Sequence, residues 1–171
     1  MPLEGIVNRR NLSVSLELDE GYVNGDPEKL EHAVANLITN SVKYACSQIE
    51  ISWKNQVLSI WNDGGELSTE DFSHMFERFH TGQNGNSGIG LALSKEIVEM
   101  HGWKLSAKND RHGICLSMVC HSYFRTNQVY SFQFVEMLQN LESRSTQCKP
   151  HHILSCQVFC RPSHRQPQTI H

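Results

Sequence analysis

The feature that most constrains the fold is a long amphipathic helix that begins at Asp26–Pro27 and follows a strand-like segment. Asp26 can accept hydrogen bonds as the N-cap, and Pro27 suits the first helical position, where a missing N–H has no partner to lose. Apolar residues recur at helical spacing as far as Tyr44 or Ala45, whereas residues 12–18 alternate between apolar and mostly polar residues. We therefore expect a helix that packs its apolar face on a sheet.

Further periodic segments follow this helix. Alternation over residues 49–53 and again over 57–61, with Asn55 and Gln56 between them, predicts a β-hairpin. Because strands and helices alternate while hairpins intervene, the sequence predicts an α+β fold with a mixed sheet and helices packed on one face. The remaining predicted elements are a short helix from Ser68 to Phe76, a helix from 89 to 100 that Gly102 ends, and strands over 104–107 and 114–120, joined at Asn109 and Gly113.

Charge and hydropathy exclude several functional classes. The 171 residues carry 15 basic and 18 acidic side chains, a net charge of −3, so neither nucleic acid nor an anionic membrane is an expected partner. No stretch approaches the roughly 20 apolar residues of a membrane-spanning helix, and the start lacks the pattern of a secretory signal. We expect a soluble, cytoplasmic protein. Cys46, Cys115 and Cys120 stand among apolar residues, as reduced core thiols do.

The composition changes near residue 122. Acidic residues outnumber basic ones before this point, and basic residues outnumber acidic ones after it. We expect a folded domain over 1–122 and a poorly ordered Cys- and His-rich tail over 123–171, within which residues 132–141 could form a short helix. The tail has no Cys-x2-Cys pair or comparable spacing, so its cysteines and histidines do not predict a metal site. These residues are Cys148, His151, His152, Cys156, Cys160 and His164.

One edge of the long helix carries polar side chains beside the apolar stripe. Asn36, Asn40, Lys43 and Tyr44 fall within about 100° of one another around the helix axis. Amide oxygens can ligate a hard cation, and a lysine can neutralise a phosphate. Such a set suits the lip of a nucleotide pocket, although taken alone it is more typical of a solvated helix face.

Two glycine-containing segments follow strands or precede helices. Asn62 to Leu67 contains two glycines directly after a strand, where the backbone can approach a flat ligand, or where a simple turn can form. Gly88-Ile89-Gly90-Leu91 precedes a helix, whose first N–H groups can face a phosphate. The second segment lacks both the ending of a P-loop and the third glycine of a dinucleotide fingerprint. Each segment is weak evidence by itself.

Order and spacing make the combination specific. The segments Asn36–Tyr44, Asn62–Gly64, Phe76–Phe79 and Gly85–Leu91 resemble, in this order, the N, G1, F and G2 boxes of the catalytic ATP-binding domain of sensor histidine kinases. The similarity covers roughly residues 3–122. It implies a two-layer α/β sandwich, the fold shared with gyrase B, MutL and heat-shock chaperone ATPases, and it implies ATP and Mg²⁺ as ligands.

The resemblance also assigns roles by position. Asn40 would ligate Mg²⁺ together with the triphosphate, Lys43 would neutralise phosphate charge, and Tyr44 would lie against the nucleotide. Asn62 would accept a hydrogen bond from the adenine amino group, and Gly64 would leave room for the ring. The glycines of the G2 box would hinge the lid and seat the phosphates. The other residues that the resemblance places around the nucleotide are Leu67, Phe79, Gly85, Gly88, Ile89, Gly90 and Leu91.

Asn36 stands where the hydrolysing relatives carry a glutamate that activates water. An amide cannot accept that proton, so bound ATP should persist until a histidine reaches its γ-phosphate. With Asn40 and Lys43, Asn36 forms the predicted catalytic set. Two departures from the family pattern, Asn62 for the usual aspartate and Glu66 for a glycine, predict weaker nucleotide binding, as does the absence of Lys and Arg from His80 to Ser87.

The partners follow from the same resemblance. No histidine of this chain has the sequence context of the family's phosphorylation site, so this chain alone should not autophosphorylate. We expect a monomer that phosphorylates the histidine of a separate or missing dimerisation domain, with a response regulator downstream. Two alternatives remain: a non-catalytic nucleotide-binding module that regulates a kinase, and a serine kinase of the anti-sigma-factor type.

Overall fold

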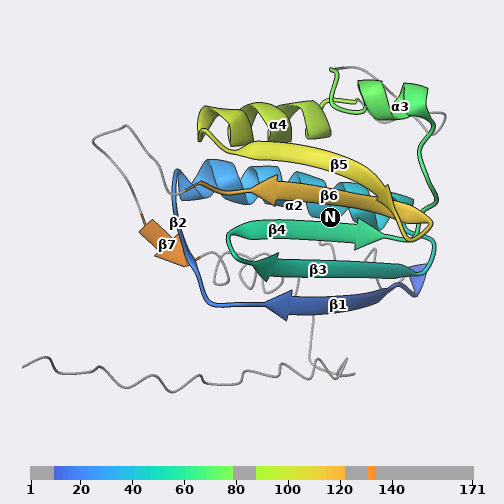
Figure 1. Ribbon diagram of the computed structural model, residues 1–171, viewed down its shortest axis with the longest axis horizontal. Helices are drawn as coiled ribbons and strands as arrows, with labels where there is room; N and C mark the ends of the chain where they lie inside the picture. The colour runs from blue at the N-terminus through green and yellow to red at the C-terminus, as the bar shows by residue number, and fades with distance from the viewer. Residues whose placement is uncertain (1–9, 79–87, 122–130, 134–171) are drawn as a thin grey trace, which may run out of the picture.

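The computed structural model describes residues 10–78, 88–121 and 131–133 (Figure 1). The predicted hairpin and the three helices predicted before residue 122 are present in this part of the chain. The elements, in chain order, are β1 (Ser13–Leu18), β2 (Tyr22–Asn24), α2 (Pro27–Tyr44), β3 (Gln48–Lys54), β4 (Val57–Asn62), α3 (Thr69–His74), α4 (Gly90–Met100), β5 (Lys104–Asp110), β6 (Gly113–Val119) and β7 (Ser131–Gln133).

Five of the strands form a mixed sheet in the order β1-β3-β4-β6-β5. β1 runs parallel to β3, and the other neighbours are antiparallel. Asn55 and Gln56 make the β3–β4 turn with φ of 49° and 62°, the left-handed pair that matches the twist of a hairpin. Arg111 and His112 make the β5–β6 turn in the same way, so β5 extends to Asp110, three residues beyond the predicted end.

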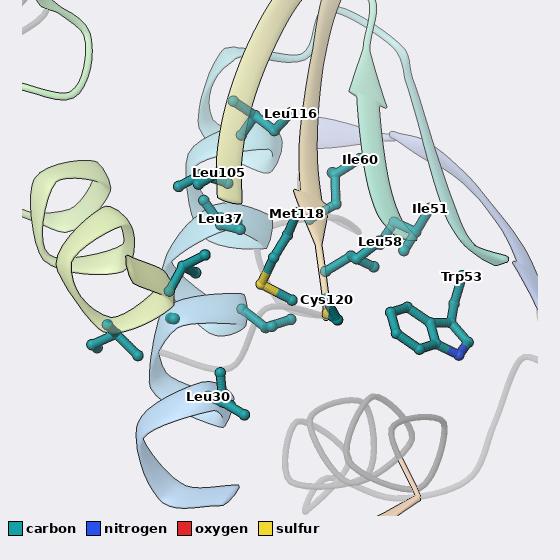
Figure 2. Packing of buried hydrophobic residues seen from close by; sticks show 14 of the residues in the cluster. Leu30, Leu37, Ile51, Trp53, Leu58, Ile60, Leu105, Leu116, Met118 and Cys120 are labelled. Atoms are coloured by element: carbon teal, nitrogen blue, oxygen red, sulfur yellow. The ribbon is translucent and has the colours of Figure 1, made fainter. Parts of the chain in front are cut away.

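The hydrophobic core lies between one face of the sheet and the two long helices, as predicted. α2 packs against α4 and β4, and α4 packs against β5. Figure 2 shows Leu30 and Leu37 of α2 facing the inward side chains of the strands. Trp53, Leu58, Ile60, Leu116 and Met118 are almost fully buried there. Burial of a large apolar side chain contributes roughly 1.5–3 kcal/mol, so this layer carries much of the stability.

The opposite face of the sheet is polar. Ser52, Ser59, Ser117 and Ser106 stand in register across four neighbouring strands. Since these positions alternate with the buried ones, the strands have the period of a sheet covered on one side only. This agrees with the predicted two-layer arrangement.

Part of the segment that the sequence assigns to the tail pairs with the domain. β7 forms an antiparallel two-stranded sheet with β2, with Phe132 opposite Val23. The prediction of a short helix over 132–141 is therefore wrong at Phe132, which lies in a strand. Most of 123–171, including the six Cys and His residues weighed as metal ligands, lies outside the described residues.

The cysteines only partly match the prediction. Cys115 and Cys120 are buried free thiols, whereas Cys46 is exposed, because it follows the end of α2 on the surface. Burial raises the pKa of the Cys120 thiol to about 12, which keeps it protonated. Among the described helices, none has the length and apolar content needed to cross a membrane.

Candidate nucleotide-binding site

Three segments that carry the predicted site residues meet at one end of the sheet (Figure 1). They are the carboxyl end of β4, the carboxyl-terminal half of α2 and the beginning of α4. The contact between α2 and α4 includes the amide of Asn36, since a Cβ built on Gly90 would lie 3.9 Å from Asn36 Cγ. Residues more than 50 positions apart are thus neighbours at this end.

The polar edge of α2 lies partly open to solvent. Asn36, Asn40 and Lys43 are half-buried, and Tyr44 is 39% exposed. The Lys43 ammonium donates to the Tyr44 hydroxyl at 3.1 Å and stands 4.7 Å from the centre of its ring. The apolar stripe beside this edge is buried, as its spacing predicts. The structure thus keeps two amides, an ammonium and a phenol on one edge.

The end of β4 holds Asn62 and Gly64 in a tight backbone approach. Asn62 is 2% exposed, and its Oδ1 accepts a hydrogen bond from Gly64 N at 3.1 Å. A Cβ at Gly64 would lie 2.2 Å from the carbonyl oxygen of Tyr44, so the chain requires glycine here. The Asn62 carbonyl has a second lone pair, which is compatible with the role predicted toward adenine.

Asp63 is a structural anchor that the sequence did not reveal. Its carboxylate accepts hydrogen bonds from the N–H groups of Cys46, Ser47 and Gln48 at 2.9–3.0 Å, and from Ser47 Oγ at 2.6 Å. Burial opposes ionisation, but the hydrogen bonds from Ser47, Gln48 and Cys46 outweigh it and hold the pKa of Asp63 well below its usual range. The charged Asp63 thereby joins the G1 segment to the chain that leaves α2.

Leu67 is held by a second long-range contact. The Asn109 side chain accepts from Leu67 N at 3.1 Å and donates to Leu67 O at 3.0 Å. Asn109 therefore fixes the backbone that follows the glycines, although the sequence offered it only as a turn residue. Glu66, the departure from the family pattern, is exposed and lies 3.7 Å from His112 Nδ1.

The N-cap residue of α4 does not cap the helix with its side chain. Ile89 is the N-cap and makes no side-chain cap hydrogen bond, while Gly88 adopts a φ of +60° that favours glycine. Ile89 is 39% exposed and Leu91 half-buried. A helix start of this kind is suited to a phosphate because its N–H groups and dipole favour negative charge.

The F-box segment is joined to α4 by an ion pair. Arg78 donates to both carboxylate oxygens of Glu96 at 2.7 Å, and Lys95 lies 5.5 Å from the ring centre of Phe76. Phe79 and Gly85 lie outside the described residues, so their predicted roles stay predictions.

The family assignment rests on a comparison of the whole domain. The family model described as histidine kinase-, DNA gyrase B-, and HSP90-like ATPase matches residues 25–123, more than half of the chain. The chain belongs to this ATPase family. Its N, G1 and G2 boxes are the segments that the structure brings together.

Curated relatives and solved structures agree with the family. The sensor histidine kinase CssS of Bacillus subtilis is 36% identical over 111 residues, which cover 62% of this chain and 25% of CssS. The heme sensor protein HssS of Staphylococcus saprophyticus is 29% identical over 113 residues, covering 61% and 25%. This chain thus spans about a quarter of the length of these relatives.

The fold matches solved catalytic domains. The catalytic domain of histidine kinase ThkA superposes with a TM-score of 0.63 at 22% identity, covering 70% of this chain and 85% of that one. The mycobacterial sensor histidine kinase MprB gives a TM-score of 0.59 at 23% identity, covering 70% and 90%. These matches confirm the predicted fold, and the family model confirms the prediction of a histidine kinase-like ATPase domain.

The donor set suits a magnesium ion that arrives with the nucleotide. Within the described ranges, no group of three or more His, Cys, Asp or Glu side chains could hold a metal by itself. Mg²⁺ needs only one or two protein oxygens when phosphates and water supply the rest. The half-buried amide of Asn40, between Asn36 and Lys43 on the ATPase-family helix, fits that requirement.

A separate cavity lies on the polar face of the sheet. It has a volume of about 310 Å³ and is lined by residues that include Glu50, Ser59, Trp61 and Arg111. None of the residues that the family resemblance assigns to ATP lines it. The nucleotide site is therefore located by the family segments and their contacts, and not by this cavity.

Proposed function

We propose that residues 1–122 bind Mg-ATP and transfer its γ-phosphoryl group to a histidine of a dimerisation domain in a two-component pathway. The observation that carries this proposal is the contact of the Asn36 edge of α2 with Gly90 at the start of α4. A nucleotide bound beside this contact would meet amides, an ammonium and helix N–H groups. Phosphoryl transfer depends mainly on such positioning and charge neutralisation.

Each site residue has a defined task in this proposal. Lys43 lies against the triphosphate and offsets its charge, and Tyr44 lies against the nucleotide. Asn40 holds Mg²⁺, which when bound neutralises charge on the phosphate oxygens. Asn62 accepts from the adenine amino group, while the N–H groups that begin at Gly90 receive a phosphate. Asn36 leaves water without a general base, so transfer to histidine is favoured over hydrolysis.

The partners belong to the same proposal. The acceptor is a histidine on a dimerisation domain, a response regulator acts downstream, and this chain works as a monomer in the cytoplasm, where ATP is supplied. A regulatory module would bind nucleotide without transfer, and a serine kinase would modify a different side chain. The acceptor experiment below separates the three.

The first test is metal-dependent nucleotide binding. We expect Asn40→Ala to weaken ATP binding in Mg²⁺ by about tenfold or more, because a ligand of the bound ion is lost. In EDTA the variant and the wild type should bind alike. Calorimetry measures both affinities, and Thr39→Ala, an exposed neighbour on the same turn of α2, is the matched control. Equal binding by Asn40→Ala and wild type in Mg²⁺ would remove the role given to Asn40.

The second test is transfer itself. Wild-type protein is mixed with labelled ATP and a separately produced dimerisation domain from a sensor histidine kinase. Acid-labile label on the histidine supports the proposal, whereas label on a serine supports the anti-sigma-type alternative. Nucleotide binding without any label on the acceptor leaves the regulatory module.

A further inference from the structure

Arg10 caps the carboxyl-terminal end of α2 from outside the family segments. Its guanidinium donates to the carbonyl oxygens of Val42 at 2.7 Å, Lys43 at 2.5 Å and Ala45 at 2.7 Å. These oxygens lie 32 to 35 positions away in the sequence. Arg10 also precedes residue 25, where the family model begins to match, and it lies in none of the four box segments.

The end of α2 needs such a partner. The last carbonyl groups of a helix find no N–H donor within the helix. Together they form the negative end of the helix dipole. Many helices close with a glycine in the left-handed region, but the C-cap here is Ala45 with φ −53° and ψ 142°. A planar guanidinium can serve three carbonyl groups at once, which a single ammonium cannot do in the same geometry.

The carbonyl group that Arg10 leaves out faces the G1 segment. Tyr44 O lies against Gly64, where a Cβ would come within 2.2 Å. Arg10 therefore holds the end of α2 through three carbonyl oxygens, while the fourth lies so close to Gly64 that no side chain fits between them. Lys43 and Tyr44, whose side chains face the proposed nucleotide, belong to the last turn of α2.

We propose that Arg10 is a positioning residue for nucleotide binding, which orients Lys43 and Tyr44 by holding the backbone of the last turn of α2. This role rests on the proposed function. It predicts a larger effect on ligands with phosphates than on adenosine, because Lys43 is the residue assigned to the phosphates.

A matched control is available on the other face of the sheet. Arg111 also uses its guanidinium for surface contacts, pairing with Glu50 at 2.7 Å and stacking 4.3 Å from the Trp61 ring centre. Its removal should cost a comparable amount of stability without reaching α2. Arg10→Lys is the conservative variant, which keeps the charge and loses the three-carbonyl geometry.

The experiment measures Mg-ATP and adenosine affinities by calorimetry, with thermal unfolding of each 171-residue variant alongside. We expect Arg10→Ala to weaken Mg-ATP binding by about tenfold, the size expected for losing a charged hydrogen-bond partner, and adenosine binding by less. Arg10→Lys should recover part of the loss, and Arg111→Ala should bind both ligands as wild type does. In Lys43→Ala, adding Arg10→Ala should have little further effect, since coupled residues are not additive.

Three outcomes would overturn the inference. Mg-ATP affinity could be unchanged in Arg10→Ala, the loss could be equal for adenosine, or Arg111→Ala could lose affinity equally through general destabilisation. Failure of the proposed function is distinguishable from these, because then the wild-type protein itself would bind no nucleotide.

Discussion

The two ends of α2 are held by different kinds of contact. At the amino end, the Asp26 side chain accepts from Lys29 N at 3.2 Å and pairs with the Lys29 ammonium at 2.8 Å, and Pro27 begins the helix. At the carboxyl end, Arg10 holds the last carbonyl groups and Asp63 holds the chain that follows the helix, and neither residue is a near neighbour in sequence. The amino end has a local side-chain cap and a distant partner, His101, and is remote from the proposed nucleotide, whereas the carboxyl end has no local side-chain cap among the described residues and carries Lys43 and Tyr44.

This difference suggests that the two ends of α2 have different tasks: the amino end stabilises the fold, and the carboxyl end also positions the nucleotide site. The local cap at Asp26 and Pro27 favours a helix that starts at this point of the sequence. Distant contacts place the last turn relative to other segments, which is what a ligand shared by several segments requires. We therefore expect changes at the amino end to affect stability alone, and changes at the carboxyl end to affect stability and nucleotide binding together.

The largest expected loss of stability is at the amino end, where His101 supports the cap. Its Nε2 accepts from Asp26 N at 3.0 Å, and its Nδ1 donates to Ile97 O at 2.7 Å. The ring is 5% exposed. We expect His101→Ala to lower the free energy of unfolding by about 3 kcal/mol, from a cavity and unpaired backbone groups. Urea denaturation measures this loss.

His101→Gln is the control for that variant, because its amide oxygen can still accept from Asp26 N. It should retain part of the stability. Under conditions in which His101→Ala is folded, its nucleotide affinity should equal that of the wild type. A clear drop in that affinity would show that the amino end of α2 also positions the site.

The next effect in size is at Asp63. We expect Asp63→Asn to lower the free energy of unfolding by about 2 kcal/mol at neutral pH, since one amide cannot replace four hydrogen bonds to a carboxylate. Unlike His101→Ala, this variant should also weaken Mg-ATP binding severalfold. Asp71→Asn is a control at an exposed carboxylate in the first turn of α3, which accepts from the N-cap residue Ser68.

Acid pH gives an independent test of Asp63. Its folded-state pKa is lowered, so the ionised group stabilises the fold above its unfolded pKa near 4. That contribution is lost as the pH falls below about 4 toward the folded-state pKa. The stability difference between wild type and Asp63→Asn should therefore shrink between about pH 4 and pH 2. A difference that stays constant over this range would mean that the charge of Asp63 is not the source of its effect.

Most of the fold could be predicted because its signals are local. Asp26–Pro27 fixed the start of α2, and alternation around Asn55 and Gln56 predicted the β3–β4 hairpin. The pairing of β7 with β2 could not be predicted, because three residues are too few to show an alternating pattern and their partner strand lies more than a hundred positions away. The exposure of Cys46 likewise depends on where the chain turns after α2.

The site was predictable as a set of segments and not as a set of contacts. Four boxes in family order indicated Asn36, Asn40 and the G2 glycines, and the structure brings Asn36 to Gly90. Asp63 and Asn109 were missed because their partners are backbone groups, which every residue possesses and no sequence pattern distinguishes. The Asp-Gly pair at Asp63 was visible, but it indicated only a turn.

The smallest expected effect is at the N-cap itself. Asp26 accepts from Lys29, and this contact with the Lys29 side chain and backbone lowers the Asp26 pKa. Asp26→Ala should lower the free energy of unfolding by about 1 kcal/mol, and Asp26→Ser should recover most of it because serine is also a good N-cap. Thermal unfolding compares the three proteins. Mg-ATP affinity should not change in either variant, since the remote last turn of α2 keeps Arg10 and Asp63. An affinity loss in Asp26→Ala that Asp26→Ser restores would mean that the helix transmits the state of its first turn to its last, and the two ends would then act as one unit.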